Sequence, residues 1–249
     1  MKIVKYKKRS NGLYTLYLDD CNTYDMYEEI ILKYELLLKK NISNDELLKI
    51  QSDNKNYESY YEALKILKKS LKTKREIEEK LGKKEYNKTN IEFALKTLEK
   101  QGYINDKSYA KSYVHNAIII SLKGPNKVIL ELENKGITPD DYIDALKEYT
   151  NEIEIEKINK IVTKKINSNH NKSAKVLKQK ISLDLINNGF TKELIKEVIS
   201  NLKIEENKSI KEKEYQKYYN KLSKKYNGKE LEFKLKQKMY SLGFSVDNE

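Results

Sequence analysis

The chain has 249 residues and carries 50 Lys or Arg against 38 Asp or Glu, which gives a formal net charge of +12 and an isoelectric point near 9.3. Two prolines and eight glycines exclude collagen-like and proline-rich disordered chains, while 38% hydrophobic residues are enough to build cores. The single cysteine, Cys21, excludes a disulfide framework and a cysteine-based zinc site.

No apolar run approaches the roughly 18 residues that a membrane span needs, and the first residues contain no apolar signal segment. We therefore expect a soluble cytoplasmic protein with no membrane partner. The excess of basic residues favours a polyanionic partner, such as nucleic acid or a nucleoprotein. A biased genome would enrich lysine in the same way, so charge alone does not decide the function.

The first twenty residues differ in pattern from the rest of the chain. Val4 and Tyr6 alternate with lysines, and residues 13–18 are rich in aromatic and β-branched side chains. Between them, Asn11 and Gly12 are typical of a type I′ turn, so the segment is predicted to form a β-hairpin. A lone hairpin is marginally stable in water, so we expect it to pack on the next segment of the chain, with a short third strand near residues 24–27.

A helical pattern follows over residues 28–38. Ser43 and Glu46 then form a predicted capping box that opens a short helix through residue 50. The polar stretch 51–56 is interpreted as a linker.

Beyond residue 56, every segment has helical periodicity. The apolar residues recur at steps of three and four, and no strand-like alternation of comparable length interrupts them. Clear examples are Tyr57, Tyr60, Tyr61, Leu64 and Leu67; Ile91, Ala94, Leu95 and Leu98; Ile155, Ile158, Val162 and Ile166.

One short pattern occurs three times: an apolar residue, three further residues, glycine, an apolar residue and a hydroxyl residue. The glycines are Gly136, Gly189 and Gly243, and successive copies are 53 and 54 residues apart. A degenerate copy begins at Leu81, 51 residues upstream. In each copy, a glycine at positive φ is expected to end one helix, and Thr or Ser is expected to cap the next.

The repeats divide the chain into units of about 50 residues with three helices each. An N-terminal β-hairpin plus helices occupies residues 1–56, followed by units at 57–104, 105–151, 152–204 and an incomplete fourth at 205–249. The fold class is therefore mainly α, with tandem three-helix repeats that stack into an elongated, curved array. The net charges of the five segments are +1, +4, −1, +5 and +3.

Signs of catalysis are weak. His115 and His170 lie in different units without a partner motif, Cys21 has no companion, and no phosphate-binding glycine loop occurs. Asp140 and Asp141 follow Thr138 and Pro139, where first-turn acids favour the helix dipole. We expect no catalytic residue, no metal site and no cofactor.

Lysines are the candidate binding residues. In the third unit a group spans the end of one helix and the start of the next, where it could contact phosphates or acidic protein surface; the alternative is a solvated helix face. The group consists of Lys164, Lys165, Lys172, Lys175, Lys178 and Lys180. In the first unit, Lys68, Lys69, Lys72 and Lys74 are the next surface to test.

Tyrosine is abundant, with 20 copies. Tyr218, Tyr219 and Tyr226 would stack on bases only if they faced outward, and the periodicity instead favours the core.

The order of the motifs in the helical repeats resembles that of the RecX family. The resemblance covers residues 57 to about 150 strongly and 152–204 moderately, and it includes Tyr61, Leu64, Thr73, Glu76 and Leu81. Its structural motif residues are Gly102, Tyr103, Asp106, Ala110, Gly124, Pro125, Leu132, Gly136, Ile137, Gly189 and Phe190.

The resemblance implies tandem three-helix repeats, in agreement with the repeat period. It also implies a function that composition does not reveal. RecX proteins bind RecA, the ATP-dependent recombinase that polymerises on single-stranded DNA, and usually inhibit its filament. The implied partners are therefore RecA and its single-stranded DNA filament, with direct DNA binding in addition, and the chain is expected to be a monomeric, non-enzymatic regulator.

Two alternatives stay open. The first is a helix-turn-helix regulator that binds duplex DNA directly, and the second is a scaffold whose basic charge is incidental. Binding to RecA-coated single strands, naked single strands and duplex at one salt concentration distinguishes them.

Overall fold

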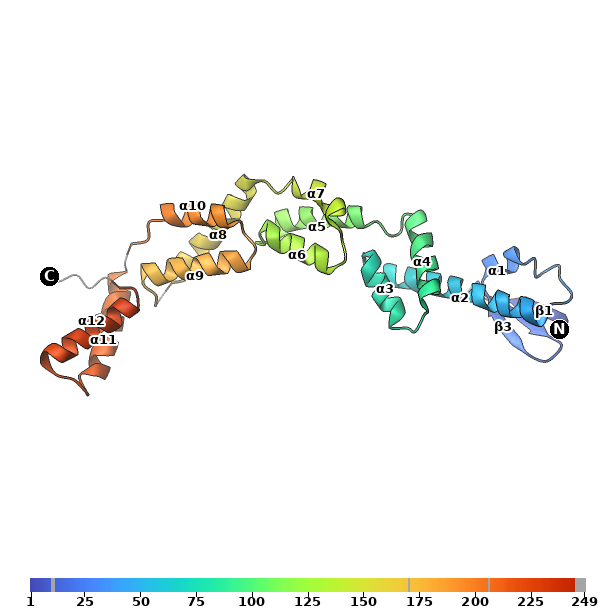
Figure 1. The fold of residues 1–249 in the computed structure, drawn as a ribbon, viewed down its shortest axis with the longest axis horizontal. Helices are drawn as coiled ribbons and strands as arrows, with labels where there is room; N and C mark the ends of the chain where they lie inside the picture. Colours follow the sequence, from blue (N-terminus) through green and yellow to red (C-terminus); the bar gives the residue numbers. More distant parts are fainter. Residues whose placement is uncertain (10–11, 170, 206, 245–249) are drawn as a thin grey trace. The chain divides into compact units, whose positions relative to one another are not determined.

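The computed structural model describes residues 1–9, 12–169, 171–205 and 207–244, and this part of the chain contains twelve helices and one three-stranded sheet (Figure 1). It forms two compact units. The first comprises Met1–Tyr109 and Lys135–Ile137, and the second comprises Ala110–Asn134 and Thr138–Glu249. Within the described residues, no helix has the length and apolar character that a membrane crossing requires.

The N-terminal sheet confirms the predicted hairpin and third strand. It consists of β1 (Ile3–Lys8), β2 (Tyr14–Leu18) and β3 (Thr23–Met26), antiparallel in that order. Leu16 in the central strand pairs with Tyr6 on one side and Tyr24 on the other. Of the predicted turn, Asn11 lies outside the described residues, and Gly12 has a φ of 83°.

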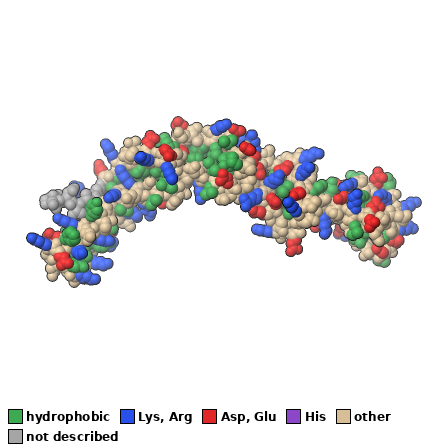
Figure 2. All heavy atoms as spheres, viewed as in Figure 1, with side chains coloured by type: hydrophobic (Ala, Val, Ile, Leu, Met, Phe, Trp, Pro, Cys, Tyr) green, Lys and Arg blue, Asp and Glu red, His purple; other side chains and the backbone are tan. Residues whose placement is uncertain are grey.

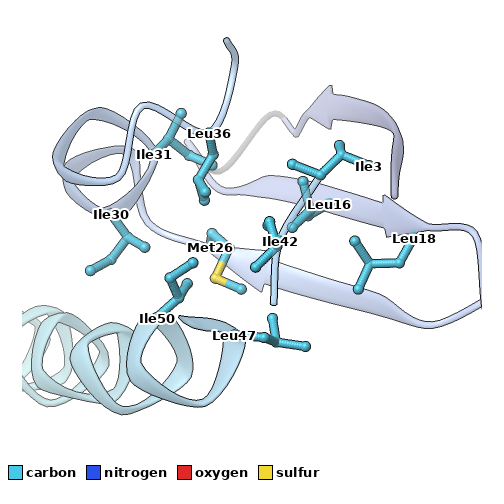
Figure 3. Packing of buried hydrophobic residues seen from close by; sticks show 10 residues of the cluster. All are labelled: Ile3, Leu16, Leu18, Met26, Ile30, Ile31, Leu36, Ile42, Leu47 and Ile50. Carbon is cyan, nitrogen blue, oxygen red and sulfur yellow. The ribbon is translucent and has the colours of Figure 1, made fainter. Parts of the chain in front are cut away.

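The hairpin packs on the helices next to it in the chain, as expected. Figure 3 shows side chains from the sheet, from α1 (Glu28–Lys33) and from α2 (Asn44–Leu67) converging on one apolar cluster. Its buried members are Ile3, Leu16, Leu18, Met26, Ile30, Ile31, Leu36, Ile42, Leu47 and Ile50.

Helix α1 ends earlier than the sequence pattern predicts. The helical pattern extends to residue 38, but the helix stops at Lys33, and Glu35 adopts a φ of 53°. This left-handed residue redirects the chain, so that Leu36 is fully buried while Leu38 is 81% exposed. Burial of Leu36 against the sheet therefore overrides the local helical pattern.

The predicted linker at 51–56 is wrong, because these residues lie inside the 24-residue helix α2. Their polar side chains bond to other elements. The Asn54 side chain accepts from the Tyr27 N–H and donates to the Asp25 carbonyl, both at 2.9 Å. Asp53 accepts from the Tyr34 hydroxyl at 2.7 Å. The boundary predicted at residue 56 therefore falls within a continuous helix.

Of the capping box predicted at the start of α2, only the hydrogen bond to the Ser43 hydroxyl forms. The Ser43 hydroxyl accepts from the Glu46 N–H at 3.2 Å, whereas the Glu46 carboxylate pairs with the Lys39 ammonium.

The remaining helices of the first unit pack on the C-terminal half of α2. They are α3 (Lys74–Gly82) and α4 (Lys88–Lys100), and their core includes Ile77, Leu81, Ala94 and Leu98.

The second unit continues the helical pattern. Its helices are α5 (Asp106–Ile120), which begins in the first unit, α6 (Pro125–Asn134), α7 (Pro139–Leu146), α8 (Asn151–Asn167), α9 (Ala174–Asn187), α10 (Lys192–Asn201), α11 (Lys208–Leu222) and α12 (Gly228–Ser241).

The repeated glycine turns are confirmed. Gly136, Gly189 and Gly243 have φ values of 79°, 80° and 79°. In the degenerate copy, Glu85 occupies the corresponding position with a φ of 65°. Ser245, the hydroxyl residue of the last copy, lies outside the described residues.

These turns also dock onto the starts of other helices. The Gly124 N–H, just before α6, donates to the Asn188 carbonyl at 2.8 Å. The Ser173 hydroxyl at the start of α9 donates to the Leu242 carbonyl at 2.7 Å. The Thr73 hydroxyl at the start of α3 donates to the Lys135 carbonyl at 2.8 Å. A helix start and a helix-ending turn are thus joined three times in a similar way. The four-unit division itself stays a prediction.

Candidate basic contact surfaces

The six candidate lysines within residues 152–204 lie at the end of α8, in α9 and just before α9. They do not all have the same role. The Lys165 ammonium lies 2.6 Å from the Asp184 carboxylate. The Lys178 ammonium donates to the Leu202 carbonyl. Both are occupied in holding α8, α9 and the chain after α10 together, which makes them structural residues in the fold.

The other four lysines are more accessible. Lys164, Lys175 and Lys180 are exposed, and Lys175 lies 5.6 Å above the Tyr240 ring. Lys172 is half-buried, with its ammonium 3.1 Å from the Asn171 side-chain oxygen. The charge available to a ligand in this region is therefore smaller than the six lysines suggest.

A denser group of lysines than these six lies within residues 57–104. There the end of α2 and the end of α3 border a groove of about 800 Å³. Figure 2 shows Lys and Arg side chains spread over the visible face, with acidic side chains among them. The groove is lined by Glu62, Lys65, Ile66, Lys68, Lys69, Ser70, Lys72, Lys80, Lys83 and Lys84. We call this set the α2–α3 groove.

The α2–α3 groove carries a large excess of positive charge. Glu62, the one carboxylate among its described lining residues, lies 2.6 Å from Lys84 and 3.3 Å from Lys65. The hydrogen bond from Lys84 is the main cause that lowers the pKa of Glu62. Within the described residues, the groove's remaining lysines include four without an ion pair. They are Lys68, Lys69, Lys80 and Lys83.

Helix ends explain why lysines collect there. Lys65 and Lys68 lie in the last turn and at the C-cap of α2, and Lys80 and Lys83 occupy the same places in α3. Cations at these positions interact favourably with the partial negative charge of a helix C-terminus. The fold brings the two ends to one groove, which spacing along the chain does not reveal.

Part of this surface was also named from the sequence. Lys68, Lys69 and Lys72 line the α2–α3 groove, whereas Lys74 pairs with Glu99 at 2.7 Å outside it. Lys72 is 3.8 Å from Glu76.

Residues considered for chemistry have ordinary places. His115 is exposed on α5, and His170 lies outside the described residues. The Asp141 carboxylate accepts from the Thr138 hydroxyl at 2.8 Å, as an N-terminal cap of α7. In the part of the chain that the structure describes, no three His, Cys, Asp or Glu side chains are grouped to hold a metal ion.

Comparison with known proteins places the chain in a family. A family model described as the second three-helix domain of RecX matches residues 105–146. The regulatory protein RecX of Bacillus cereus (strain G9842) is 31% identical over 252 residues, covering 98% of this chain and 93% of the relative. The chain belongs to the RecX family. The RecX of Bacillus cytotoxicus is 30% identical with the same coverage.

Solved RecX structures share the fold. A crystal structure of a regulatory protein RecX aligns with a TM-score of 0.73 at 28% identity, covering 81% of this chain and 99% of the other. The RecX of Lactobacillus salivarius aligns with a TM-score of 0.55 at 32% identity, covering 60% and 97%. The mainly helical fold predicted from the periodicity and the repeats of the sequence is therefore confirmed.

The RecX motif residues lie mostly in turns and cores. Leu132, Ile137 and Phe190 are buried, as is Ala110. Pro125 is the first residue of α6, Gly102 has a φ of 76°, and the Asp106 carboxylate accepts from the Lys74 N–H at 3.1 Å. Tyr103 differs, because it is 56% exposed.

Proposed function

We propose that this RecX-family chain is a non-enzymatic regulator that binds RecA and RecA–single-stranded DNA filaments and inhibits their recombinase and ATPase activities in recombination and DNA repair. Family membership over nearly the whole chain supports RecA as the target. In this proposal the chain acts as a monomer in the cytoplasm, where the filament forms.

The α2–α3 groove is the observation that supports a nucleoprotein partner. Among the described residues, four lysines without an ion pair border one concave surface, and Glu62, the lining carboxylate, is already neutralised. Ammonium groups that replace counterions on phosphates gain free energy by counterion release. The groove therefore suits the DNA phosphates or an acidic surface of the filament, and Lys164, Lys172, Lys175 and Lys180 form a second proposed contact.

Two charge-reversed variants test this assignment. The groove variant changes Lys68, Lys69, Lys80 and Lys83 to Glu, and the matched variant changes Lys164, Lys172, Lys175 and Lys180 to Glu. Both leave Lys165 and Lys178 in place, so the packing around α8 and α9 is kept. We expect the groove variant to bind RecA-coated single strands at least tenfold more weakly than the parent, and the matched variant to show a smaller loss.

The same titration separates the alternatives. Parent protein is measured against RecA-coated single strands, naked single strands and duplex at one ionic strength. The proposal expects the tightest binding to the RecA-coated strand and a steep loss of affinity as salt rises. Tight binding to duplex alone would instead identify a duplex-binding regulator.

A further inference from the structure

The C-terminal helical hairpin carries a second groove that is distinct from the α2–α3 groove. It lies between α11 and α12 and has a volume of about 560 Å³. Its described lining residues include no carboxylate. They are Tyr218, Lys221, Leu222, Tyr226, Lys234, Gln237, Lys238 and Ser241. We call it the α11–α12 groove.

Three ammonium groups reach this groove from both helices. Lys221 belongs to α11, and Lys234 and Lys238 lie one turn apart on α12. None of the three has an ion-pair partner within the described residues. The Lys238 ammonium instead lies 5.0 Å from the centre of the Tyr218 ring. Because no described carboxylate neutralises them, these lysines attract an anion to the groove.

Two tyrosines give the groove an aromatic wall. Tyr218 projects from α11, Tyr226 lies in the turn before α12, and both are half-buried. In the described part of the chain, neither phenol hydroxyl has a hydrogen-bond partner. Buried tyrosines elsewhere do, such as Tyr149, whose hydroxyl donates to the Lys123 carbonyl at 2.6 Å. Both rings line the groove with their polar ends unused, and the Tyr218 ring also lies 5.3 Å from the Lys217 ammonium.

Polar side chains complete the rim. Gln237 and Ser241 lie one turn apart on α12 beside Lys234 and Lys238, and both are exposed. An amide both donates and accepts hydrogen bonds, which suits the edge of a nucleobase. The groove therefore combines cations, aromatic faces and a hydrogen-bonding amide in one place.

We propose that the α11–α12 groove binds unpaired nucleotides of single-stranded DNA. The phosphates lie against Lys221, Lys234 and Lys238, and a base packs on Tyr218 and Tyr226. Aromatic stacking needs an exposed base face, which a strand offers and an intact duplex hides. The basic charge continues past the groove, because residues 207–244 contain 11 lysines and 4 acids, as a strand longer than one nucleotide requires.

The expectation that Tyr218, Tyr219 and Tyr226 belong to the core holds for one of them. Tyr218 packs against the buried cluster of Ile210, Leu235, Met239 and Phe244 and also borders the groove. Tyr219 is 42% exposed and stacks on Tyr215, and Tyr226 is half-buried at the groove. The periodicity places them on an apolar stripe, but a two-helix hairpin covers only part of that stripe.

The proposal is tested without RecA by measuring, through fluorescence anisotropy, the binding of the protein to two labelled DNA strands of 30 nucleotides each. One strand is oligo-dT, and the other is an abasic strand with the same phosphates. We expect the full-length parent to bind oligo-dT more tightly. Tyr218→Leu with Tyr226→Leu should weaken binding to oligo-dT about fivefold or more and leave the abasic strand unchanged. Lys221→Gln, Lys234→Gln and Lys238→Gln together should weaken both.

Tyr103→Leu is the matched control, since Tyr103 is exposed in the first unit, and it should bind both strands as the parent does. Should the tyrosine variant fail to fold, photocrosslinking of the unmodified protein to iodouracil-substituted DNA replaces it, with adducts expected at Tyr218 or Tyr226. Equal affinity of the parent for both strands, an unchanged affinity of the folded tyrosine variant for oligo-dT, or adducts confined to other segments would overturn the proposal. None of these outcomes bears on RecA binding.

Discussion

A turn can require glycine for two separate reasons. One is a backbone that needs a positive φ, and the other is a neighbouring segment that leaves no space for a Cβ atom. Gly102 and Gly189 share nearly the same positive φ, 76° and 80°. Around Gly102 a Cβ would meet nothing within 4 Å, whereas at Gly189 it would lie 2.2 Å from the backbone nitrogen of Lys127. The first glycine is needed for its φ alone, and the second also for the approach of α6.

Alanine substitution separates the two reasons. Gly102→Ala should lower the free energy of unfolding by about 1 kcal/mol, the usual cost of a left-handed alanine. Gly189→Ala should cost at least about 2 kcal/mol more, since backbone atoms cannot move aside cheaply. Urea unfolding of both variants measures the difference, and equal losses would mean that the turn does not dock on the start of α6.

Glu76 links charge to a helix cap. Its carboxylate accepts from the Thr73 N–H at 3.1 Å and from the Lys135 ammonium at 2.8 Å. Burial alone would raise the pKa of Glu76, but these hydrogen bonds, together with the charges of Lys135 and Lys72, hold the pKa below the usual 4.5. The stabilisation is therefore complete above pH 4.5 and is lost as the pH falls through the lower folded-state pKa.

Glu76→Gln keeps the capping geometry and removes the charge. We expect it to lower the free energy of unfolding by about 1 kcal/mol at pH 7 and by progressively less as the pH falls below 4.5, because the parent then loses the charge as well. Glu92→Gln is the control, because Glu92 is exposed and should change stability by less than about 0.5 kcal/mol. If the difference in the free energy of unfolding between parent and variant were the same at pH 7 and well below pH 4.5, the charge of the carboxylate would have no role in stability.

Among the elements, α2 shows where local patterns mislead. Residues 51–56 are all polar and predict a linker, but Asp53 and Asn54 bond to α1 and to the end of β3. These tertiary bonds hold a polar segment in a helix, and they join the N-terminal sheet to the first three-helix group.

Proline tests whether α2 is continuous. Lys55→Pro should lower the free energy of unfolding by about 3 kcal/mol or more, because proline lacks the N–H and clashes with the carbonyl one turn earlier. Lys55→Ala, at the same exposed site, should change it by less than about 0.5 kcal/mol. If both substitutions changed the free energy of unfolding equally little, residues 51–56 would be a linker after all and not part of a continuous helix.

Elements governed by local rules could be predicted from the sequence. The hairpin, the glycine turns and the Ser43 cap depend on residues a few positions apart, and the structure confirms them. The binding surface depends on packing instead. Lys165 is available to a ligand by its sequence context alone, but the fold brings Asp184 beside it, and the α2–α3 groove arises only when two helix ends meet.

At the scale of the whole molecule, the account is electrostatic. The segments 57–104 and 152–204 carry net charges of +4 and +5, so binding to a nucleoprotein should weaken strongly with salt. Between about 50 and 200 mM salt, we expect the affinity for RecA-coated strands to fall at least tenfold. A salt-independent affinity, measured by anisotropy, would point to an apolar contact instead.

The most direct test of the central claim is RecA's single-stranded-DNA-dependent ATP hydrolysis with and without this protein at one ionic strength. We predict that the parent protein slows hydrolysis in a dose-dependent way and that the variant with Glu at 68, 69, 80 and 83 slows it much less while keeping its helical spectrum. An unchanged rate with the folded parent protein in excess over RecA would contradict the proposed role.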